Sequence, residues 1–314
     1  MTVAPVFERV ASDVQWDPVY LDLQRPEHVI TFADFGPGAE GGGVFSPVAV
    51  TSPFRILNDE GLRVLQTVCR ELEAYATESV RIPKRMRGGV YRSNFLRGLV
   101  SHPELLSFLR ALAQAPLEPH PVFHHAAHLN YAPDDLTKDV DQWHYDSVSF
   151  DIVMMVTDPR GMKGGRFEYF HGPVEEGLAI LEDGRGLPPE RVVSVEFPGP
   201  GWCILQQGHR VLHRATRLEE PGERITLVAS FWTPDPALAD PTDLRVLLKA
   251  DGRDVALVEG SRYAALAAAR RLERFAAEEA VVGRPLDDVR DALRASLAEV
   301  EQALSAFGPG HRRP

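Results

Sequence analysis

The chain has 314 residues and a mass of 34.8 kDa, enough to bury a sizeable core without disulfides or structural metals. Hydrophobic residues make up 44% and charged residues 25% of it, proportions that exclude a disordered or fibrous chain. The formal net charge of −11 is unfavourable for binding duplex nucleic acid, which requires clustered lysine and arginine.

Features that the sequence lacks exclude further classes of protein. The two cysteines, Cys69 and Cys203, are too few for a disulfide framework. No run of eighteen apolar residues occurs, so we expect no membrane-spanning helix. The N-terminus has no basic patch followed by an apolar stretch, as a secretion signal would. We therefore expect a soluble, cytoplasmic protein.

Helices are predicted in the N-terminal segment, residues 1–120. Asn58 is a favourable N-cap, and Asp59 and Glu60 follow it in the first turn. An apolar stripe then predicts an amphipathic helix, with Leu62, Leu65, Cys69, Leu72 and Ala76 on one face. A second helix is predicted over residues 103–114, with proline in its first turn. We expect these helices to buttress the main domain.

Residues 121–236 are predicted to form a mainly β domain. Its strand-like segments are VFHHAAHLNY, VSFDIVMMVT, GGRFEYF, VVSVEF, GWCILQQ, RVLHRAT and RITLVASFW. Turns rather than helices separate most of them, so an antiparallel sandwich or barrel is expected. The sequence contains no glycine-rich nucleotide-binding motif. The long connection over residues 171–189 is either a lid over a substrate or a plain insertion.

Residues 237–314 are predicted to form a C-terminal helical extension, with helices over residues 261–279 and 285–306. Apolar residues of the last helix recur every three or four positions: Leu286, Val289, Leu293, Leu297, Val300, Leu304 and Phe307. This helix packs either on the barrel of its own chain, which we favour, or on a second subunit, which would make a homodimer.

Candidate chemistry begins with the segment QWHYDSVSF. On a strand, His144 and Asp146 would project from the same face. A neighbouring strand supplies His213 as a third metal ligand, and His209 is the alternative residue for that place. Two imidazoles and one carboxylate on one side of a metal leave open positions that suit Fe(II) oxygen chemistry, whereas a structural zinc site would require a fourth ligand. Alternation also places Arg224 and Thr226 on one face of the next strand.

Together these residues resemble the signature of the Fe(II)/2-oxoglutarate-dependent oxygenases. That signature is His-x-Asp, a distant His, ten further residues, and then Arg-x-Ser or Arg-x-Thr, which here is His144, Asp146, His213, Arg224 and Thr226. Two further features resemble the prolyl-hydroxylase-like branch. Tyr131 stands in a Tyr-x-Pro-x-Asp turn, and Gly164-Gly165-Arg166-Phe167 matches the opening of a later barrel strand. The resemblance covers about residues 121–233.

The resemblance implies a double-stranded β-helix, or jelly-roll, fold with iron bound by His144, Asp146 and His213. Arg224 would pair with the far carboxylate of 2-oxoglutarate, because a guanidinium matches a carboxylate in bidentate geometry. Thr226 and Tyr131 would add hydrogen bonds to the same carboxylate. Dioxygen would then oxidise an unactivated C–H bond, with release of succinate and CO2. Because the carboxylate ligand Asp146 is present, the resemblance implies hydroxylation, desaturation or ring closure rather than halogenation.

The expected substrate is a small molecule, such as an amino acid or a biosynthetic intermediate. Two alternatives remain open at this point: the same chemistry on a protein side chain, and a jelly-roll binding module without catalysis. The histidines at 120, 124, 125 and 128 could be taken for a second metal site. Their apolar neighbours suit a strand, so we expect a structural or substrate-contacting role for them. Arg224 has an alternative as well, a surface ion pair with Glu219, Glu220 or Glu223.

Overall fold

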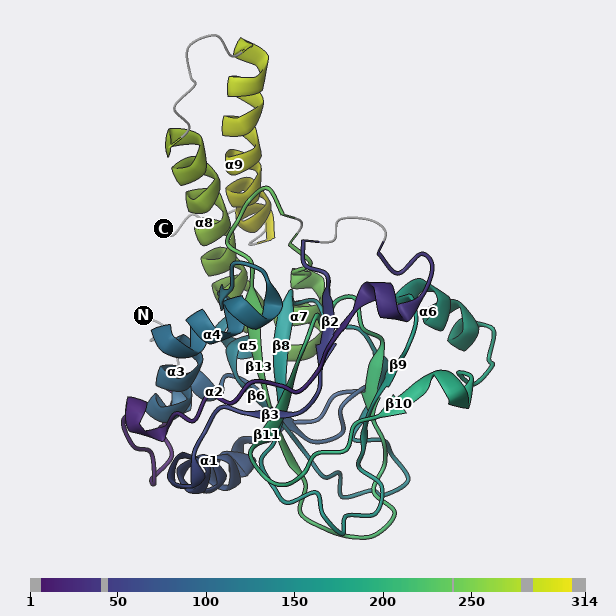
Figure 1. Cartoon of the computed structure of the whole chain (residues 1–314). Coiled ribbons are helices and arrows are strands. Elements are labelled where there is room, and N and C mark those ends of the chain that lie inside the picture. The colour runs from purple at the N-terminus through teal and green to yellow at the C-terminus, as the bar shows by residue number, and fades with distance from the viewer. Residues whose placement is uncertain (1–6, 41–44, 239, 278–284, 307–314) are drawn as a thin grey trace.

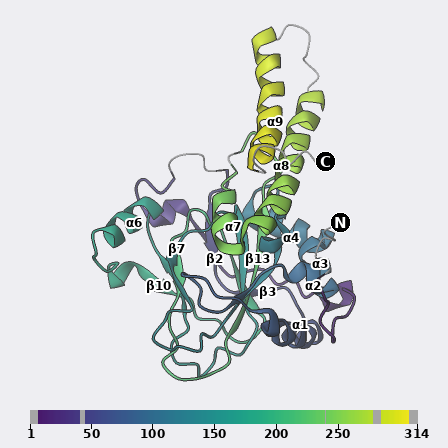
Figure 2. The same cartoon turned by 180° about the vertical axis from the view of Figure 1, so that it is seen from behind.

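Two antiparallel sheets form the centre of the computed structural model, which describes residues 7–40, 45–238, 240–277 and 285–306 (Figures 1 and 2). The larger sheet contains β1 Val29–Thr31, β2 Val48–Thr51, β3 Phe54–Arg55, β4 Arg85–Met86, β5 Glu118–Pro119, β6 His128–Tyr131, β8 Phe150–Met155, β11 Trp202–Gln206 and β13 Ile225–Trp232. The smaller sheet contains β7 Asp141–His144, β9 Phe167–Phe170, β10 Val192–Ser194 and β12 His213–Ala215. The prediction of a mainly β chain with flanking helices is confirmed.

The helices come from three parts of the chain. They are α1 Asp59–Leu72, α2 Gly89–Arg92, α3 Asn94–Ser101, α4 Pro103–Ala113, α5 Phe123–Ala126, α6 Val174–Glu182, α7 Leu244–Asp251, α8 Arg253–Ala277 and α9 Leu286–Ala306. Helix α1 starts as its sequence predicts, because the Asn58 side chain accepts a hydrogen bond of 2.9 Å from the backbone N–H of Gly61. Among the described residues, no helix has both the length and the apolar character to cross a membrane.

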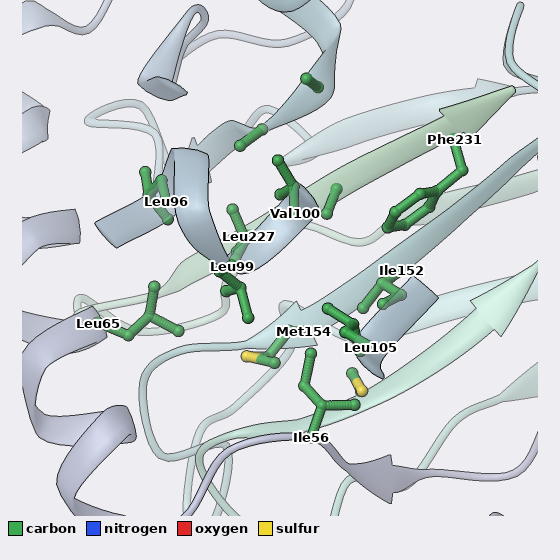
Figure 3. Close-up of a cluster of buried hydrophobic side chains, with 14 of the residues drawn as sticks. Ile56, Leu65, Leu96, Leu99, Val100, Leu105, Ile152, Met154, Leu227 and Phe231 are labelled. Carbon is green, nitrogen blue, oxygen red and sulfur yellow. The ribbon is translucent and has the colours of Figure 1, made fainter. Parts of the chain in front are cut away.

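Side chains alternate between the two faces of the larger sheet, and this alternation places the site. Ile152 and Met154 of β8 and Leu227 and Phe231 of β13 pack against helices α1, α3 and α4 (Figure 3). The residues between them face the smaller sheet and line a cavity, namely Asp151, Val153, Thr226 and Val228. One face therefore carries the hydrophobic core, and the other carries polar groups enclosed between the sheets.

Two segments differ from the predicted elements. Residues 123–126 form the short helix α5 instead of continuing the strand that leads to β6. Its first N–H, on Phe123, donates to the Glu259 carboxylate of α8 at 2.8 Å, a contact with a residue 136 positions away. The connection at 171–189 contains α6, whose Val174 packs on Phe170 and Leu212. Neither contact can be anticipated from local sequence preference.

The C-terminal helices attach to the sheets through buried ion pairs. At the end of α7, Asp251 contacts Arg85 at 3.3 Å and Arg87 at 2.8 Å. Glu259 of α8 contacts His124 at 3.2 Å and accepts a hydrogen bond from Tyr91. Helix α7 was not predicted. Helix α8 begins earlier than expected, and the last two positions of its predicted range lie outside the described residues.

The domain boundaries at residues 120 and 236 stay predictions. Strands β1 to β5 all come from the first 120 residues, yet they pair with strands of the larger sheet. The N-terminal segment therefore supplies sheet as well as buttressing helices.

We predict that Leu65→Ala lowers the free energy of unfolding by about 2–5 kcal/mol, since Leu65 is fully buried between α1 and the sheet and truncation leaves a cavity. Arg63→Ala, on the exposed face of the same helix, is the matched control and should change stability by less than about 0.5 kcal/mol. Urea unfolding monitored by circular dichroism measures both. Equal effects of the two variants would contradict the packing described here.

Candidate metal centre

The pairing of β12 with β7 brings two distant histidines together. His213 is directly opposite His144 in the antiparallel register, and their ring centroids are 4.1 Å apart. The sequence suggested that Asp146 lies on the same strand as His144. In the structure β7 ends at His144, and Asp146 lies in the segment that follows it. Its backbone N–H donates to the carbonyl of Gly208 at 2.9 Å, which holds the turn beside the strand that leads to His213.

The three side chains converge on one point. Asp146 Oδ1 lies 3.4 Å from His144 Nε2, and Asp146 Oδ2 lies 3.3 Å from His213 Nε2. One ligand atom from each residue falls within 4.8 Å of the others, and no second such group of histidine, cysteine or acidic residues is found in the part of the chain that the structure describes. The facial arrangement of two imidazoles and one carboxylate is therefore present.

The backbone fixes which nitrogen of each imidazole faces the centre. The Nδ1–H of His144 donates to the carbonyl of Gln142 at 2.7 Å, and the Nδ1–H of His213 donates to the carbonyl of Val211 at 2.8 Å. Because a carbonyl can only accept, the neutral form of each ring has its lone pair on Nε2, which faces Asp146. Such a hydrogen bond on the outer nitrogen is the usual support of a metal-binding histidine, so the residues fit a divalent metal ion.

Burial and mutual attraction perturb the pKa of each ligand. For His144, burial first and the charge of Arg81 second lower the pKa. For His213, burial opposes the charged form, but the Asp146 carboxylate outweighs it and raises the pKa above 6.5. For Asp146, burial favours the neutral acid, but the two imidazoles outweigh it and hold the pKa well below its usual range. Asp146 is therefore ionised at neutral pH and available to a cation.

A second carboxyl group lies directly beside the ligands, which sequence reasoning missed. Asp151 of β8 is fully buried; its Oδ1 accepts a hydrogen bond of 2.9 Å from the Gln206 amide, and that amide lies 3.3 Å from His213 Nε2. Burial first, and then the negative charge of Asp146, raise the pKa of Asp151 well above its usual range. A single acidic residue within the apolar run VSFDIVMMVT was the available signal.

Only glycine fits at position 208. A Cβ atom there would lie 2.2 Å from Asp151 Oδ2 and 3.1 Å from the Cβ of Asp146. The backbone of Gly208 therefore approaches both carboxylates closely while its carbonyl holds the Asp146 turn. This close approach is a specific requirement of the site, because a side chain at this position would displace the Asp151 carboxylate and press on Asp146.

Arg224 is a buried guanidinium in the same cavity. It is 2% exposed, its Nε donates to the carbonyl of Gly165 at 2.7 Å, and Nη1 donates to Thr226 Oγ1 at 2.7 Å. Burial lowers the pKa of Arg224 to about 10, so it remains charged. Among the described residues no carboxylate lies within 4.0 Å of it. The surface ion pair considered for Arg224 is therefore absent: Glu223 contacts Arg70 instead, and Glu220 contacts Lys163.

The structure places Tyr131 away from the cavity, contrary to its predicted role. Its hydroxyl donates to the carbonyl of Cys69 in α1 at 2.8 Å. In the register of β6 with β13, Tyr131 is opposite Ile225, whereas Asn130 is opposite Thr226. Residues that are opposite each other share a face. Asn130 therefore lines the cavity with Thr226, and its Oδ1 has no hydrogen-bond partner among the described residues.

The other histidines have separate partners. The ring of His209 stacks on Phe45 at 5.8 Å, and its Nδ1–H donates to the carbonyl of Ser149 at 3.3 Å, so it does not join the triad. His124 contacts Glu259, and His125 contacts Arg87 at 2.7 Å. His128 alone of the cluster lines the cavity. The cluster forms no second metal group in the described residues.

The cavity lies between the two sheets. Its lining includes the triad, Asp151, Asn130, His128 and Arg224 from the strands, with Arg81 and Arg214 also present. The two outer arginines have partners, since Arg81 lies 3.4 Å from Asp141 and Arg214 lies 2.8 Å from Glu168. No residue of the 171–189 connection is part of this lining, so the structure offers no support for a lid there.

No protein-family model and no curated protein matches the chain. Similar solved structures do exist. EctD from S. alaskensis with bound Fe is 17% identical and has a TM-score of 0.45, with 73% of this chain and 86% of that chain covered. The non-heme alpha ketoglutarate dependent epimerase SnoN from nogalamycin biosynthesis is 15% identical, with a TM-score of 0.43 over 57% of this chain and 76% of that chain. A Pseudomonas putida prolyl-4-hydroxylase is 14% identical and has a TM-score of 0.41, with 58% of this chain and 91% of that chain covered.

These matches include iron and 2-oxoglutarate enzymes, the class that the sequence signature resembles. Identities of 14–17% and TM-scores of 0.41–0.45 assign no activity to this chain, whose chemistry follows from the side chains described above.

We predict that affinity for a divalent metal falls as the pH is lowered, beginning above 6.5. In the metal-free protein the raised pKa of His213 keeps a proton on the imidazole, and that proton competes with the metal. Calorimetric titration with Co(II) between about pH 6 and about pH 8 measures the change. His209→Ala should leave the affinity unchanged, because His209 is outside the triad. A pH-independent affinity would contradict the assignment.

Proposed function

We propose that the protein is an Fe(II)- and 2-oxoglutarate-dependent oxygenase that hydroxylates an unactivated C–H bond of a small molecule. One observation carries the proposal: a facial His144–Asp146–His213 triad lines the same cavity as a buried Arg224 that has no carboxylate partner among the described residues. A triad by itself suits many metals. A buried cation in the same cavity additionally calls for an anion, since buried charges in proteins are normally paired.

The triad would hold the metal from one side. Its two Nε2 atoms and the Asp146 carboxylate leave the remaining positions open toward the cavity, as non-heme Fe(II) chemistry requires. When bound, iron with 2-oxoglutarate and dioxygen supplies oxidation of a C–H bond, with release of succinate and CO2. The protein binds and orients the reactants, and enclosure between two sheets keeps bulk water away from them.

Arg224 would bind the far carboxylate of 2-oxoglutarate. Its Nε and Nη1 are occupied by Gly165 and Thr226, which fixes the plane of the guanidinium and directs the remaining N–H groups. The Thr226 hydroxyl accepts from Arg224 and can therefore donate its own proton to the same carboxylate. Asn130, on the neighbouring strand, takes the place in the cavity that the sequence signature had given to Tyr131.

The raised pKa of Asp151 supports binding of an anionic cosubstrate, because it shifts this carboxyl group toward its neutral form. With Asp151 protonated, Asp146 is the ionised carboxylate closest to the metal position, so a divalent ion keeps a net positive charge toward the cavity. A keto acid is attracted to such a centre. A second ionised carboxylate at Asp151 would weaken this attraction.

The arrangement of strands supports a double-stranded β-helix for the catalytic core. The eight strands β6 to β13, between residues 121 and 236, divide between two facing antiparallel sheets, with the two histidine ligands on the smaller sheet and Arg224 adjoining the larger one. The side chains of the three ligands are only 6–20% exposed, so a substrate must extend a slender group between the sheets. This recess favours a small molecule.

Anaerobic addition of Fe(II) and 2-oxoglutarate tests the proposal directly. We expect a weak metal-to-ligand charge-transfer band in the visible, the signature that a keto acid bound to Fe(II) would give. Asp146→Ala should lose the band together with substrate-linked succinate formation, since one of three protein ligands is missing. Folded wild-type protein that binds Fe(II) but develops no band would refute the oxygenase assignment.

Arg224 has a separate test. Arg224→Ala should raise the 2-oxoglutarate concentration needed for half-maximal band intensity by about 100-fold, the loss expected for a buried charge-assisted pair. Its affinity for the metal should stay unchanged, because Arg224 donates to no ligand. Arg160→Ala, an exposed arginine paired with Asp158, serves as the matched control. Unaltered 2-oxoglutarate dependence of Arg224→Ala would remove Arg224 from the cosubstrate site.

A further inference from the structure

Helix α9 packs against its own chain with small and polar side chains and leaves its leucines outside. Toward α8 it presents Ser296, which is 4% exposed, and Glu299, whose carboxylate lies 3.1 Å from Arg271 of α8. Its largest apolar residues are exposed: Leu286 by 85%, Leu293 by 45%, Leu297 by 55%, Val300 by 37% and Leu304 by 62%. In an ordinary surface helix the leucines would face inward.

The exposed leucines form a narrow stripe. At 3.6 residues per turn, Leu286, Leu293, Leu297 and Leu304 fall within an arc of about 40°. The hairpin of α8 and α9 projects away from the sheets, and in both views no other described helix or strand lies beside its tip (Figures 1 and 2). Phe307, which continues the sequence pattern, lies outside the described residues. We call the four leucines the leucine stripe.

We propose that the leucine stripe binds the same stripe of a second copy of this chain, with the two α9 helices antiparallel. The spacing of the stripe is symmetric: Leu286 and Leu304 are equally far from position 295, and so are Leu293 and Leu297. About a twofold axis at that level, each leucine is opposite a leucine of the partner. A twofold interface must be self-complementary, and the symmetric spacing of the leucine stripe meets this requirement.

Charges beside the stripe match the same alignment. Arg290 and Glu301 both lie about 40–60° from the centre of the stripe, on the edge away from α8. In the antiparallel pair, Arg290 of one copy is within about one residue, or ~1.5 Å of axial rise, of the level of Glu301 in the other. Symmetry forms this pair twice. Within its own helix Arg290 also lies 2.8 Å from Asp287 and 3.6 Å from Asp291, so the arginine would be shared among three acids.

A second copy is the occupant that this pattern selects. A membrane surface would favour basic residues beside the apolar stripe, whereas α9 carries five acidic residues and two arginines. An unrelated helix would have no reason to reproduce the symmetric spacing. Two α8–α9 hairpins joined through their α9 helices would make a four-helix bundle, in which the leucines become the buried centre.

Sedimentation equilibrium of the full chain tests the proposal. Wild-type protein should have twice the monomer mass of 34.8 kDa. Leu293→Glu/Leu297→Glu should raise the dimer dissociation constant by at least about 100-fold, because four carboxylates would meet at the twofold axis. Ala295→Glu/Ala298→Glu adds the same charge at exposed positions off the stripe and should remain dimeric. A monomeric wild type, or a dimeric Leu293→Glu/Leu297→Glu variant, would overturn the proposal.

The antiparallel alignment has its own test. Arg290→Glu and Glu301→Arg should each weaken the dimer by about 10-fold, and the double variant should recover wild-type affinity because the pair is restored with reversed charge. If the double variant is weaker than either single variant, the alignment is wrong. Because α9 contributes no residue to the cavity, metal binding should be unchanged in all these variants. A failure here is thereby distinguished from a failure of the oxygenase proposal.

Discussion

The antiparallel pairing of β12 with β7 is the constraint on which the site depends. It brings His213 opposite His144, two residues separated by 69 positions in the chain, and sets their rings 4.1 Å apart. The carbonyls of Gln142 and Val211 then fix both rings, and the carbonyl of Gly208 fixes the turn that carries Asp146. Backbone carbonyls thus hold both imidazoles and the Asp146 segment in place. The centre is preformed by the fold, and ordering it upon metal binding costs little entropy.

Burial and neighbouring charges set the ionisation of the three ionisable groups around this centre. Asp146 stays ionised between two imidazoles, the pKa of Asp151 beside it is raised, and Arg224 retains its charge although no described carboxylate lies within 4.0 Å of it. Two carboxyl groups so close together could not both be ionised in a low-dielectric interior. The cavity therefore has one position suited to a cation and another suited to an anion, which is the arrangement that a metal-chelating diacid requires.

Local signals predicted a good part of the structure. The Asn58 cap and its apolar stripe located α1, and the spacing of His144, Asp146, His213 and Arg224 located residues that converge. Tyr131 was misplaced because the face of a residue on β6 depends on its register with β13, and no local pattern specifies that register. Helix α5 was missed because its cap, Glu259, lies 136 residues away. Long-range pairing, rather than propensity, decided each of these outcomes.

The alternation of side chains along β6, β8 and β13 has a consequence for how the protein can change over generations. Asn130, Val153 and Val228 line the cavity, while their immediate neighbours Leu129, Met154 and Leu227 belong to the core on the opposite face. A substitution that reshapes the chamber therefore touches none of the contacts that hold the helices to the sheet. Natural variation on one side of these strands can therefore change which molecules the cavity binds, while the residues that pack the core on the other side stay the same.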